Sequence, residues 1–317
     1  MARIFSMRIE SEPLRRDAQL MAIEPWFWVV FTLVAALVQT GRNVMQRGLT
    51  ETLGTLGATQ VRFLYGFPFG VLFCVIVLTV TGAKLPNPNA ATWMWVVGGG
   101  LSQILGTFLF LAAMREKSFV VATALTKFEP VWVACFGLVF LGDSLGVALT
   151  IAIAAATAGV LVMSWPARGA QWALKPVLLG VFSGAGFGMA SIGFRGAIRS
   201  LENTSFVVGA SFILALGLCI QTLVLVGYML WRDRPLLRSI LRAWRPSLLA
   251  GAFGAGASQF WFLAFAVESA ARVRTLALVE IIFAQIISRR FLSQNSSVKE
   301  WLGMALLIVG VVLVLNS

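Results

Sequence analysis

The stretch Ser118–Leu145, SFVVATALTKFEPVWVACFGLVFLGDSL, decides the fold. It exceeds the roughly 20 mostly apolar residues that a helix needs to cross a bilayer, yet Lys127 and Glu129 lie near its middle. An ionised side chain at that depth costs roughly 2.5 kcal/mol or more, and it usually faces a cavity or a charged partner. Pro130 removes one helical hydrogen bond, which predicts a kink or an opening of the helix. The stretch therefore indicates a membrane helix with a functional interruption.

A second stretch, Arg272–Leu292 (RVRTLALVEIIFAQIISRRFL), repeats this pattern with Glu280 at its middle, 151 residues after Glu129. The same offset overlays other parts of the two regions, and an offset of 152 overlays the beginning of the chain. The matched pairs include Trp93 and Trp244, Ser118 and Ser269, Gly41 and Gly193, and Arg47 and Arg199. Aliphatic matches arise by chance in apolar chains, but mid-span acids are rare. The paired glutamates therefore indicate an internal repeat.

The composition is that of an integral membrane protein. Of the 317 residues, 59% are hydrophobic and only 12% are charged, against about 25% charged residues in soluble globular proteins. We therefore expect an all-α, polytopic membrane protein. The apolar runs predict ten transmembrane helices, at residues 26–46, 58–81, 93–113, 119–141, 145–165, 176–198, 206–230, 246–267, 272–292 and 298–316.

The predicted spans divide the chain into an N-terminal tail, residues 1–25, and two five-helix repeats, residues 26–165 and 166–317. Because five is odd, the second repeat enters the membrane from the opposite face. This predicts two inverted repeats related by a two-fold axis in the membrane plane, with a binding site between them near the midplane. Small residues, among them Gly159 and Gly310, lead us to expect that the fifth and tenth spans pack together.

Three further segments are open to more than one interpretation. The glycine-rich stretches Gly184–Gly188 and Gly251–Gly256 lie in apolar helices without a preceding strand, so we interpret them as sites of close packing and not as nucleotide loops. The segment Arg232–Arg245 carries leucines on one helical face and arginines elsewhere. It is either a basic helix at the membrane interface or a charged loop that resists translocation.

Several functional classes are excluded or disfavoured. The chain has no histidine, which removes serine–histidine triads and histidine metal sites, and its aspartates fall outside the spans, so we expect no enzyme, no metal and no cofactor. The net charge of +12 would suggest nucleic acid in a soluble protein. Here the cations lie mainly between apolar runs, where they set topology and contact lipid head groups, so we expect no nucleic-acid partner.

Glu129 and Glu280 are the candidate coupling groups. A desolvated carboxylate could load and release a proton or another ion as a cavity alternates between wet and dry states. The alternative is a structural ion pair with Lys127, Arg62 or Arg274. Lys127 and Glu129 are two positions apart and point to different faces of a helix, so Lys127 is expected to pair elsewhere.

Other polar side chains within the spans are candidates for substrate binding. Arg62 and Arg42 either extend to the membrane interface or contact substrate. The amide side chains either hydrogen-bond between helices or line the cavity, and we favour lining. The candidate substrate- and ion-binding residues are thus Glu129, Glu280, Lys127, Arg62, Gln39, Asn43, Gln103 and Gln259.

The five-plus-five pattern resembles the drug/metabolite transporter superfamily, in particular its EamA-type members. The resemblance covers nearly the whole chain after the tail, and it is carried by Gln60–Phe63 (QVRF), Lys127–Pro130 (KFEP) and Phe140–Leu145 (FLGDSL). The last resembles the family's leucine–glycine–acid–x–leucine signature, with Asp143 where glutamate is usual. Small multidrug relatives carry an essential glutamate in the first helix, whereas this chain has Gln39 there together with Arg42 and Asn43.

The resemblance implies alternating-access transport, often driven by an ion gradient, in a bacterial inner membrane with both termini cytoplasmic. We accordingly expect a secondary active transporter that exports small polar or amphipathic metabolites such as amino acids. The alternative is a passive facilitator or channel. The distribution of lysine and arginine disagrees with the implied orientation, because more of them lie in the segments on the opposite side from the termini.

Overall fold

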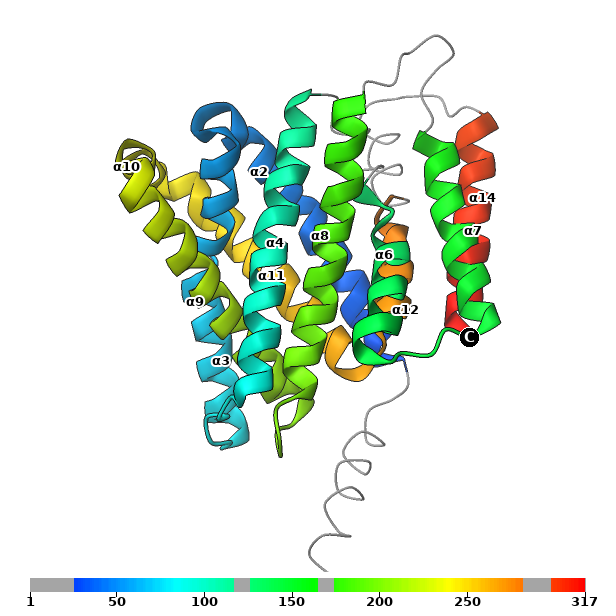
Figure 1. The fold of residues 1–317 in the computed structure, drawn as a ribbon, viewed down its shortest axis with the longest axis horizontal. Helices are drawn as coiled ribbons and strands as arrows, with labels where there is room; N and C mark the ends of the chain where they lie inside the picture. The colour runs from blue at the N-terminus through cyan, green and yellow to red at the C-terminus, as the bar shows by residue number, and fades with distance from the viewer. Residues whose placement is uncertain (1–25, 117–125, 165–173, 282–297, 317) are drawn as a thin grey trace, which may run out of the picture.

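The computed structural model describes residues 26–116, 126–164, 174–281 and 298–316. Within these residues the chain forms helices joined by short links, and no strand (Figure 1). The elements are α2 (Phe27–Leu64), α3 (Phe67–Thr81), α4 (Ala90–Glu116), α6 (Glu129–Phe136), the π-helix η1 (Gly137–Leu141), α7 (Val147–Ser164), α8 (Leu174–Arg199), α9 (Phe206–Arg232), α10 (Arg234–Arg242), α11 (Trp244–Val267), α12 (Ala270–Leu276), the 3-10 helix η2 (Ala277–Val279) and α14 (Val298–Leu315).

In the described part of the chain, five helices have the length and composition to cross a membrane. They cover Met45–Thr81, Ala90–Arg115, Leu174–Arg199, Phe206–Arg232 and Trp244–Val267. Shorter apolar helices cover Glu129–Leu141, Val147–Val162 and Trp301–Leu315. The all-helical prediction is confirmed. Parts of the predicted fourth and ninth spans, residues 119–125 and 282–292, lie outside the described residues, so the count of ten stays a prediction.

The first predicted link is confirmed. We expected the first span to end at residue 46 and the second to begin at residue 58, and α2 consists of two helical parts that meet at a kink within this interval, at Gly54 (φ 67°, ψ 178°). Glycine, which lacks a Cβ, adopts this backbone conformation without steric cost. The Gln46 amide donates a 3.0 Å hydrogen bond to the Ala58 carbonyl across the interruption. Residues 12 positions apart would lie about 18 Å apart along a continuous helix, so this contact shows that the chain folds back at Gly54.

Arg232–Arg245 contains a helix, as one of the two interpretations required. Asp233 caps α10 by accepting a hydrogen bond from the Leu236 amide at 3.1 Å. On the inner side, Ile240 is fully buried and its carbonyl accepts a 3.0 Å hydrogen bond from the Tyr65 hydroxyl. The arginines of α10 are exposed. The helix thus has one apolar and one basic side.

Glycines bring α4 and α8 into direct backbone contact. A Cβ added to Gly186 would lie 2.8 Å from the Gly106 Cα, and one added to Gly193 would lie 2.6 Å from the Gly99 Cα. Across α11, a Cβ on Gly251 would lie 2.4 Å from the Tyr65 carbonyl carbon. These distances are shorter than side chains tolerate, so the expectation of close packing at both glycine-rich stretches is confirmed.

Helices α7 and α14 pack against each other along their length at one side of the bundle (Figure 1). A Cβ on Gly159 would lie 2.6 Å from the Gly303 carbonyl oxygen, and a Cβ on Gly310 would lie 2.5 Å from the Ala156 amide nitrogen. The expected contact between the fifth and tenth spans is therefore confirmed. Small residues allow this approach because dispersion contacts, and not water exclusion, hold helices together in lipid.

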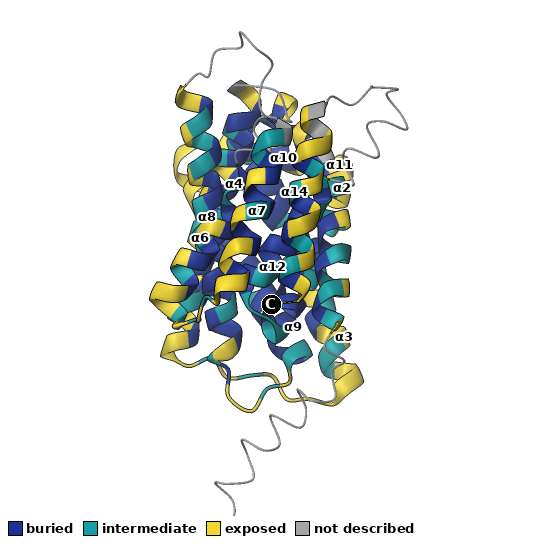
Figure 2. Cartoon of the chain, turned by 90° about the vertical axis from the view of Figure 1, so that its right-hand side faces the viewer, coloured by how far each residue is buried: buried dark blue, intermediate teal, exposed yellow. Residues whose placement is uncertain are grey.

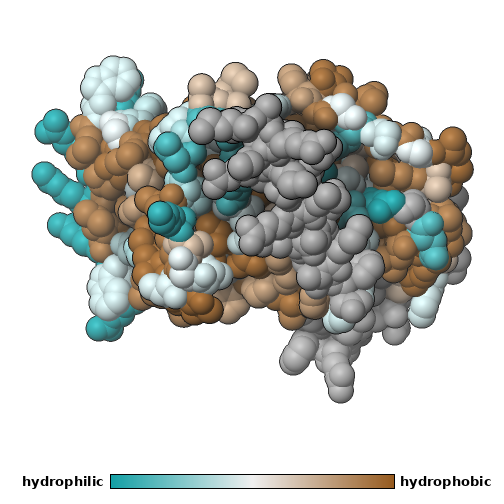
Figure 3. Space-filling model, turned by 90° about the horizontal axis from the view of Figure 1, so that it is seen from below, coloured by the Kyte–Doolittle hydropathy of each residue, from teal (hydrophilic) through white to brown (hydrophobic). Residues whose placement is uncertain are grey.

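The outer surface of the bundle is apolar. Buried residues follow the inside of the helices, and exposed ones follow the outside and the helix ends (Figure 2). Large hydrophobic side chains, such as Leu72 on α3, Leu223 on α9 and Trp301 on α14, are exposed. Seen from the lower end, hydrophobic side chains occupy much of the visible rim, and hydrophilic ones stand out at its left and right edges (Figure 3). This surface is suited to contact with lipid acyl chains.

We predict that Gly159→Ala destabilises the protein by about 1–3 kcal/mol, because the added methyl group meets backbone atoms of α14 that cannot move independently. Gly227→Ala in α9 is the matched control, since a Cβ there meets no atom within 4 Å. The control should leave stability unchanged or raise it by up to about 1 kcal/mol. Thermal unfolding in detergent measures both variants. Equal changes in stability would contradict the close packing of α7 against α14 at Gly159.

Candidate functional site

Two helix interruptions place the mid-span glutamates. Residues 127–128 form a turn that ends one helical segment, and α6 begins at Glu129 with Pro130 in its first turn. In the second half, α12 tightens into η2, and Glu280 follows directly. The predicted interruption at Pro130 is confirmed. Both carboxylates are buried, with 9% of Glu129 and 5% of Glu280 exposed.

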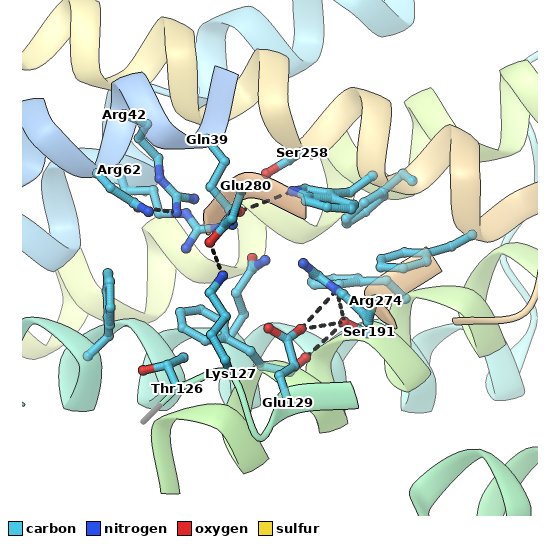
Figure 4. Close-up of a pocket in the computed structure, with 18 residues that line it drawn as sticks. Gln39, Arg42, Arg62, Thr126, Lys127, Glu129, Ser191, Ser258, Arg274 and Glu280 are labelled. Atoms are coloured by element: carbon cyan, nitrogen blue, oxygen red, sulfur yellow. Dashed lines mark hydrogen bonds and ion pairs between the residues drawn. The ribbon is translucent and has the colours of Figure 1, made fainter. Parts of the chain in front are cut away.

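The two glutamates form reciprocal ion pairs. The Lys127 ammonium contacts Glu280 Oε1, and Arg274 Nε lies 2.8 Å from Glu129 Oε1 (Figure 4). Each acid is therefore neutralised by a cation from the other half of the chain. The expectation that Lys127 pairs away from Glu129 is confirmed. Because an unpaired buried charge is strongly unfavourable, these contacts tie the two halves together.

Gln39 fixes the free oxygen of Glu280. Its amide nitrogen donates to Glu280 Oε2 at 3.2 Å, and its carbonyl oxygen accepts a 3.0 Å hydrogen bond from the Trp261 indole. The indole can only donate, so it determines which way the Gln39 amide faces. Gln39 was a predicted site residue, whereas Trp261 was not, because its apolar neighbours on α11 give no sign of this contact.

Ser191 on α8 joins the second pair. Its hydroxyl accepts a hydrogen bond from Arg274 Nε at 3.0 Å and lies 3.4 Å from Glu129 Oε1. The Arg274 guanidinium also lies over the Trp261 ring, 4.2 Å from its centroid, and 5.1 Å from that of Phe265. Cation–π contacts stabilise a guanidinium without neutralising its charge. Sequence reasoning missed Ser191, because a lone serine in a small-residue helix carries no distinctive signal.

Arg42 and Arg62 lie on the opposite side of the site (Figure 4). Only 3% of Arg42 and 4% of Arg62 is exposed. Arg42 Nη2 donates to the Asn43 side-chain oxygen at 2.7 Å, and Arg62 Nη1 donates to the Thr107 hydroxyl at 2.8 Å. Extension of these arginines to the membrane interface, one of the two interpretations, is therefore wrong.

These side chains surround a small cavity between the two halves. Its volume is about 30 Å³, which holds one or two water molecules. The cavity is narrow because the ion pairs cross it. The predicted residues that line it are Gln39, Asn43, Arg62, Gln103, Lys127, Glu129 and Glu280.

Gln259 differs from the prediction. It is not among the described residues that line the cavity, and its amide nitrogen donates a 2.9 Å hydrogen bond to the Ser211 hydroxyl of α9. It has the other role that the sequence left open, an interhelical hydrogen bond. Gln103 combines the two roles, since it lines the cavity and accepts a 2.7 Å hydrogen bond from Gln221.

A second ionic cluster lies at the lower end of the helices in Figure 1. Asp143 lies 3.8 Å from Arg195 and 3.7 Å from Arg199. Arg195 also donates to the backbone carbonyl of Glu268, whose carboxylate is 3.2 Å from Arg272. The cluster joins the link after η1 to the ends of α8 and α11. It therefore connects the two halves below the cavity.

The described residues contain no group of three or more histidine, cysteine, aspartate or glutamate side chains suited to a metal ion. The chemistry of the cavity is that of charge pairing and hydrogen bonding. Such a site can bind and release ions and polar solutes through exchange of partners.

Comparisons with known proteins identify the family. A model of the EamA-like transporter family matches residues 26–165 and 174–316. A solved crystal structure has a similar fold with a TM-score of 0.61 and 16% sequence identity, over 89% of this chain and 98% of that chain. At this identity the likeness concerns the fold alone. No curated protein matches the chain.

We predict that Lys127→Met alone destabilises the protein by about 3–5 kcal/mol, because Glu280 is left buried without its cation. The double variant Lys127→Met/Glu280→Gln should recover most of this loss, since no unpaired charge remains. Thermal unfolding of the two single variants and the double variant gives the coupling between the residues. Additive losses would contradict the cross-half ion pair.

Proposed function

The chain belongs to the EamA-like transporter family, and on this premise we propose that it is a secondary active transporter that exports small polar or amphipathic metabolites, such as amino acids, by alternating access. Membership confirms the resemblance to the drug/metabolite transporter superfamily and makes the chain a multi-pass membrane transporter. The substrate, the direction of transport and the mechanism are the proposal. So are the bacterial inner membrane as its location and the cytoplasmic side for its termini.

The observation that carries the proposal is the pair of reciprocal ion pairs across a cavity walled by both halves. Glu129 and Glu280 occupy equivalent positions in the two repeats, and each contacts a cation of the opposite repeat. A binding site at the junction of two repeats is the arrangement used by many secondary transporters. The same contacts also match the structural ion pairs that were the alternative for these glutamates, but buried charged groups within a membrane more often mark a functional pathway.

Helix contacts support the inverted relation of the repeats. The offset of about 151 residues relates α2 to α8 and α4 to α11. If the two halves are exchanged, α4 takes the place of α11 and α8 takes the place of α2. The contact between α4 and α8 therefore corresponds to the contact between α11 and α2, and both contacts are extensive. It maps the contact between α7 and α14 onto itself. The beginning of α2 and the end of α14 lie at the same end of the helices (Figure 1), as an even number of crossings requires.

The size of the cavity supports alternating access. At about 30 Å³ it is far smaller than the roughly 300–1,000 Å³ of pockets that bind small molecules. Substrate entry therefore requires the two halves to separate. The cluster around Asp143 and Arg195 joins the two halves at the lower end. Opening there would break these contacts.

The glutamates would couple substrate movement to an ion gradient. While the cavity is closed, Lys127 and Arg274 neutralise them. When the halves separate and the cations withdraw, a carboxylate must bind a proton, another cation or a substrate ammonium to remain inside the protein. Each conformational exchange then carries one of these across the membrane. A passive facilitator, the alternative function, would not need this exchange.

We predict that Glu129→Gln and Glu280→Gln each lower ion-driven uphill transport in proteoliposomes at least tenfold, since the neutral amide cannot exchange partners. Glu202→Gln, at an exposed residue outside the cavity, is the matched control and should transport normally. Unchanged uphill transport in both cavity variants would refute the role of the carboxylates. Transport that never exceeds equilibrium in the unaltered protein would favour the facilitator.

A further inference from the structure

The charges that line the cavity do not balance. Among the described residues around it, Arg42, Arg62, Lys127 and Arg274 are cations, whereas Glu129 and Glu280 are acids. The two ion pairs use Lys127 and Arg274. In the described part of the chain, no carboxylate lies at ion-pair distance from either remaining arginine. The closed cavity thus holds two positive charges in excess.

Arg42 has unused hydrogen-bond donors. Although 97% of it is buried, its Nε and Nη1 atoms have no hydrogen-bond partner among the described residues. An unsatisfied donor on a buried charged group is costly, and it is rare in native proteins unless a ligand or water completes it. The Nε–H and Nη1–H groups point to different sides of the guanidinium, so each can donate a separate charge-assisted hydrogen bond to an anion or to water.

Arg62 strengthens the requirement for an anion. Its guanidinium lies next to that of Arg42 (Figure 4), near enough for the two charges to repel each other. Thr107 and Asn43 orient the two groups but supply no negative charge. Gly254 lies next to the aliphatic parts of both arginines. A Cβ added to it would lie 3.5 Å from Arg42 Cδ and 3.5 Å from Arg62 Cγ. An anion between the guanidiniums would remove the repulsion and satisfy the donors.

The rest of the cavity wall is mainly aromatic. Phe110 and Phe187 from one side, and Phe262 and Trp261 from the other, line it together with the charged groups. Small-molecule sites commonly combine such apolar walls with a few polar groups that fix orientation. A ligand with an anionic group at the arginines and a compact apolar body would match both parts.

We propose that Arg42 and Arg62 form the subsite for the carboxylate of small organic-acid substrates that have an apolar body. This inference rests on the proposed transport function, and it names the substrate class for the same cavity. Arg42 supplies a positive charge with vacant donors, Arg62 supplies the second positive charge, and the aromatic wall receives the apolar part. The excess charge excludes organic cations as preferred substrates.

The test uses three ligands of nearly equal shape and different charge: phenylacetate, phenylacetamide and phenethylamine. Thermal unfolding of the full-length protein in detergent reports binding, because a ligand of the folded state raises the melting temperature. Phenylacetate should raise it in a concentration-dependent manner, whereas the amide and the amine should not. A response to the amine, or no response to the carboxylate, would overturn the proposal.

Arg42→Gln and Arg62→Gln should each weaken phenylacetate binding at least tenfold. Arg238→Gln, which removes an exposed charge of α10, should leave binding unchanged. Without ligand, Arg42→Gln should melt at the same temperature as the unaltered protein or higher, because it removes an unsatisfied buried charge. A purely structural arginine would show the reverse, namely lower stability and unchanged affinity.

Two further outcomes separate this proposal from its neighbours. Equal stabilisation by chloride or inorganic phosphate would indicate an adventitious ion only, and would overturn the substrate assignment. Phenylacetate binding without transport in proteoliposomes would refute the transporter proposal and leave the subsite standing. Transport of phenethylamine alone that still depends on Glu129 and Glu280 would refute the carboxylate subsite and leave the transporter proposal standing.

Discussion

The structure depends on the cost of keeping ionised groups away from water. Six charged side chains surround a cavity that holds one or two water molecules. Such charges are costly unless they are paired and hydrogen-bonded. Four of the six meet this condition, because each glutamate is neutralised by a cation of the opposite half. Neither half could bury its acid alone, so the same contacts that satisfy the charges also hold the two repeats together.

The two repeats reach equivalent geometry by different local means. In the first, a turn and Pro130 interrupt the helix and place Glu129 at the beginning of α6. In the second, a 3-10 turn at Ala277–Val279 precedes Glu280 without any proline. An interrupted helix frees backbone groups, which membrane proteins tolerate where a cavity or other helices receive them. The position of the acid at the interruption is shared, whereas the residue that causes the interruption is not.

The sequence was sufficient to predict much of the fold. Mid-span acids at equal offset, small residues in the fifth and tenth spans, and the proline next to Glu129 all have direct physical consequences, and the structure agrees with each. The helix edges near Gly54 were harder to predict, because a single backbone conformation, and not polarity, ends the helix there.

The partners within the site could not be predicted in full. Ser191 and Trp261 act only through tertiary contacts, and no local pattern distinguishes them from packing residues. Gln259 and Gln39 look alike in sequence, both amides in apolar helices, yet one contacts Ser211 and the other contacts Glu280. The difference depends on which neighbouring helix each side chain faces. Three-dimensional arrangement, and not residue type, separates binding from structural polar groups.

The proposed transport mechanism links charge to function in this chain. Because the ion pairs that cross the cavity leave no room for substrate, substrate binding under this proposal would replace or displace contacts between the halves. A ligand shifts such an equilibrium only through its different affinity for the two states. The transported molecule is thus expected to alter which of the two ends is open.

The most direct measurement is the reactivity of one cysteine placed in the cavity. Ser258, which is 4% exposed and lines the cavity (Figure 4), would be replaced by cysteine in a chain lacking Cys74, Cys135 and Cys219. In proteoliposomes, a hydrophilic thiol reagent should modify this cysteine slowly, and transported substrate should slow the reaction further. Failure to react from either side of the membrane, or a rate that substrate leaves unchanged, would contradict a water-filled binding cavity between the repeats.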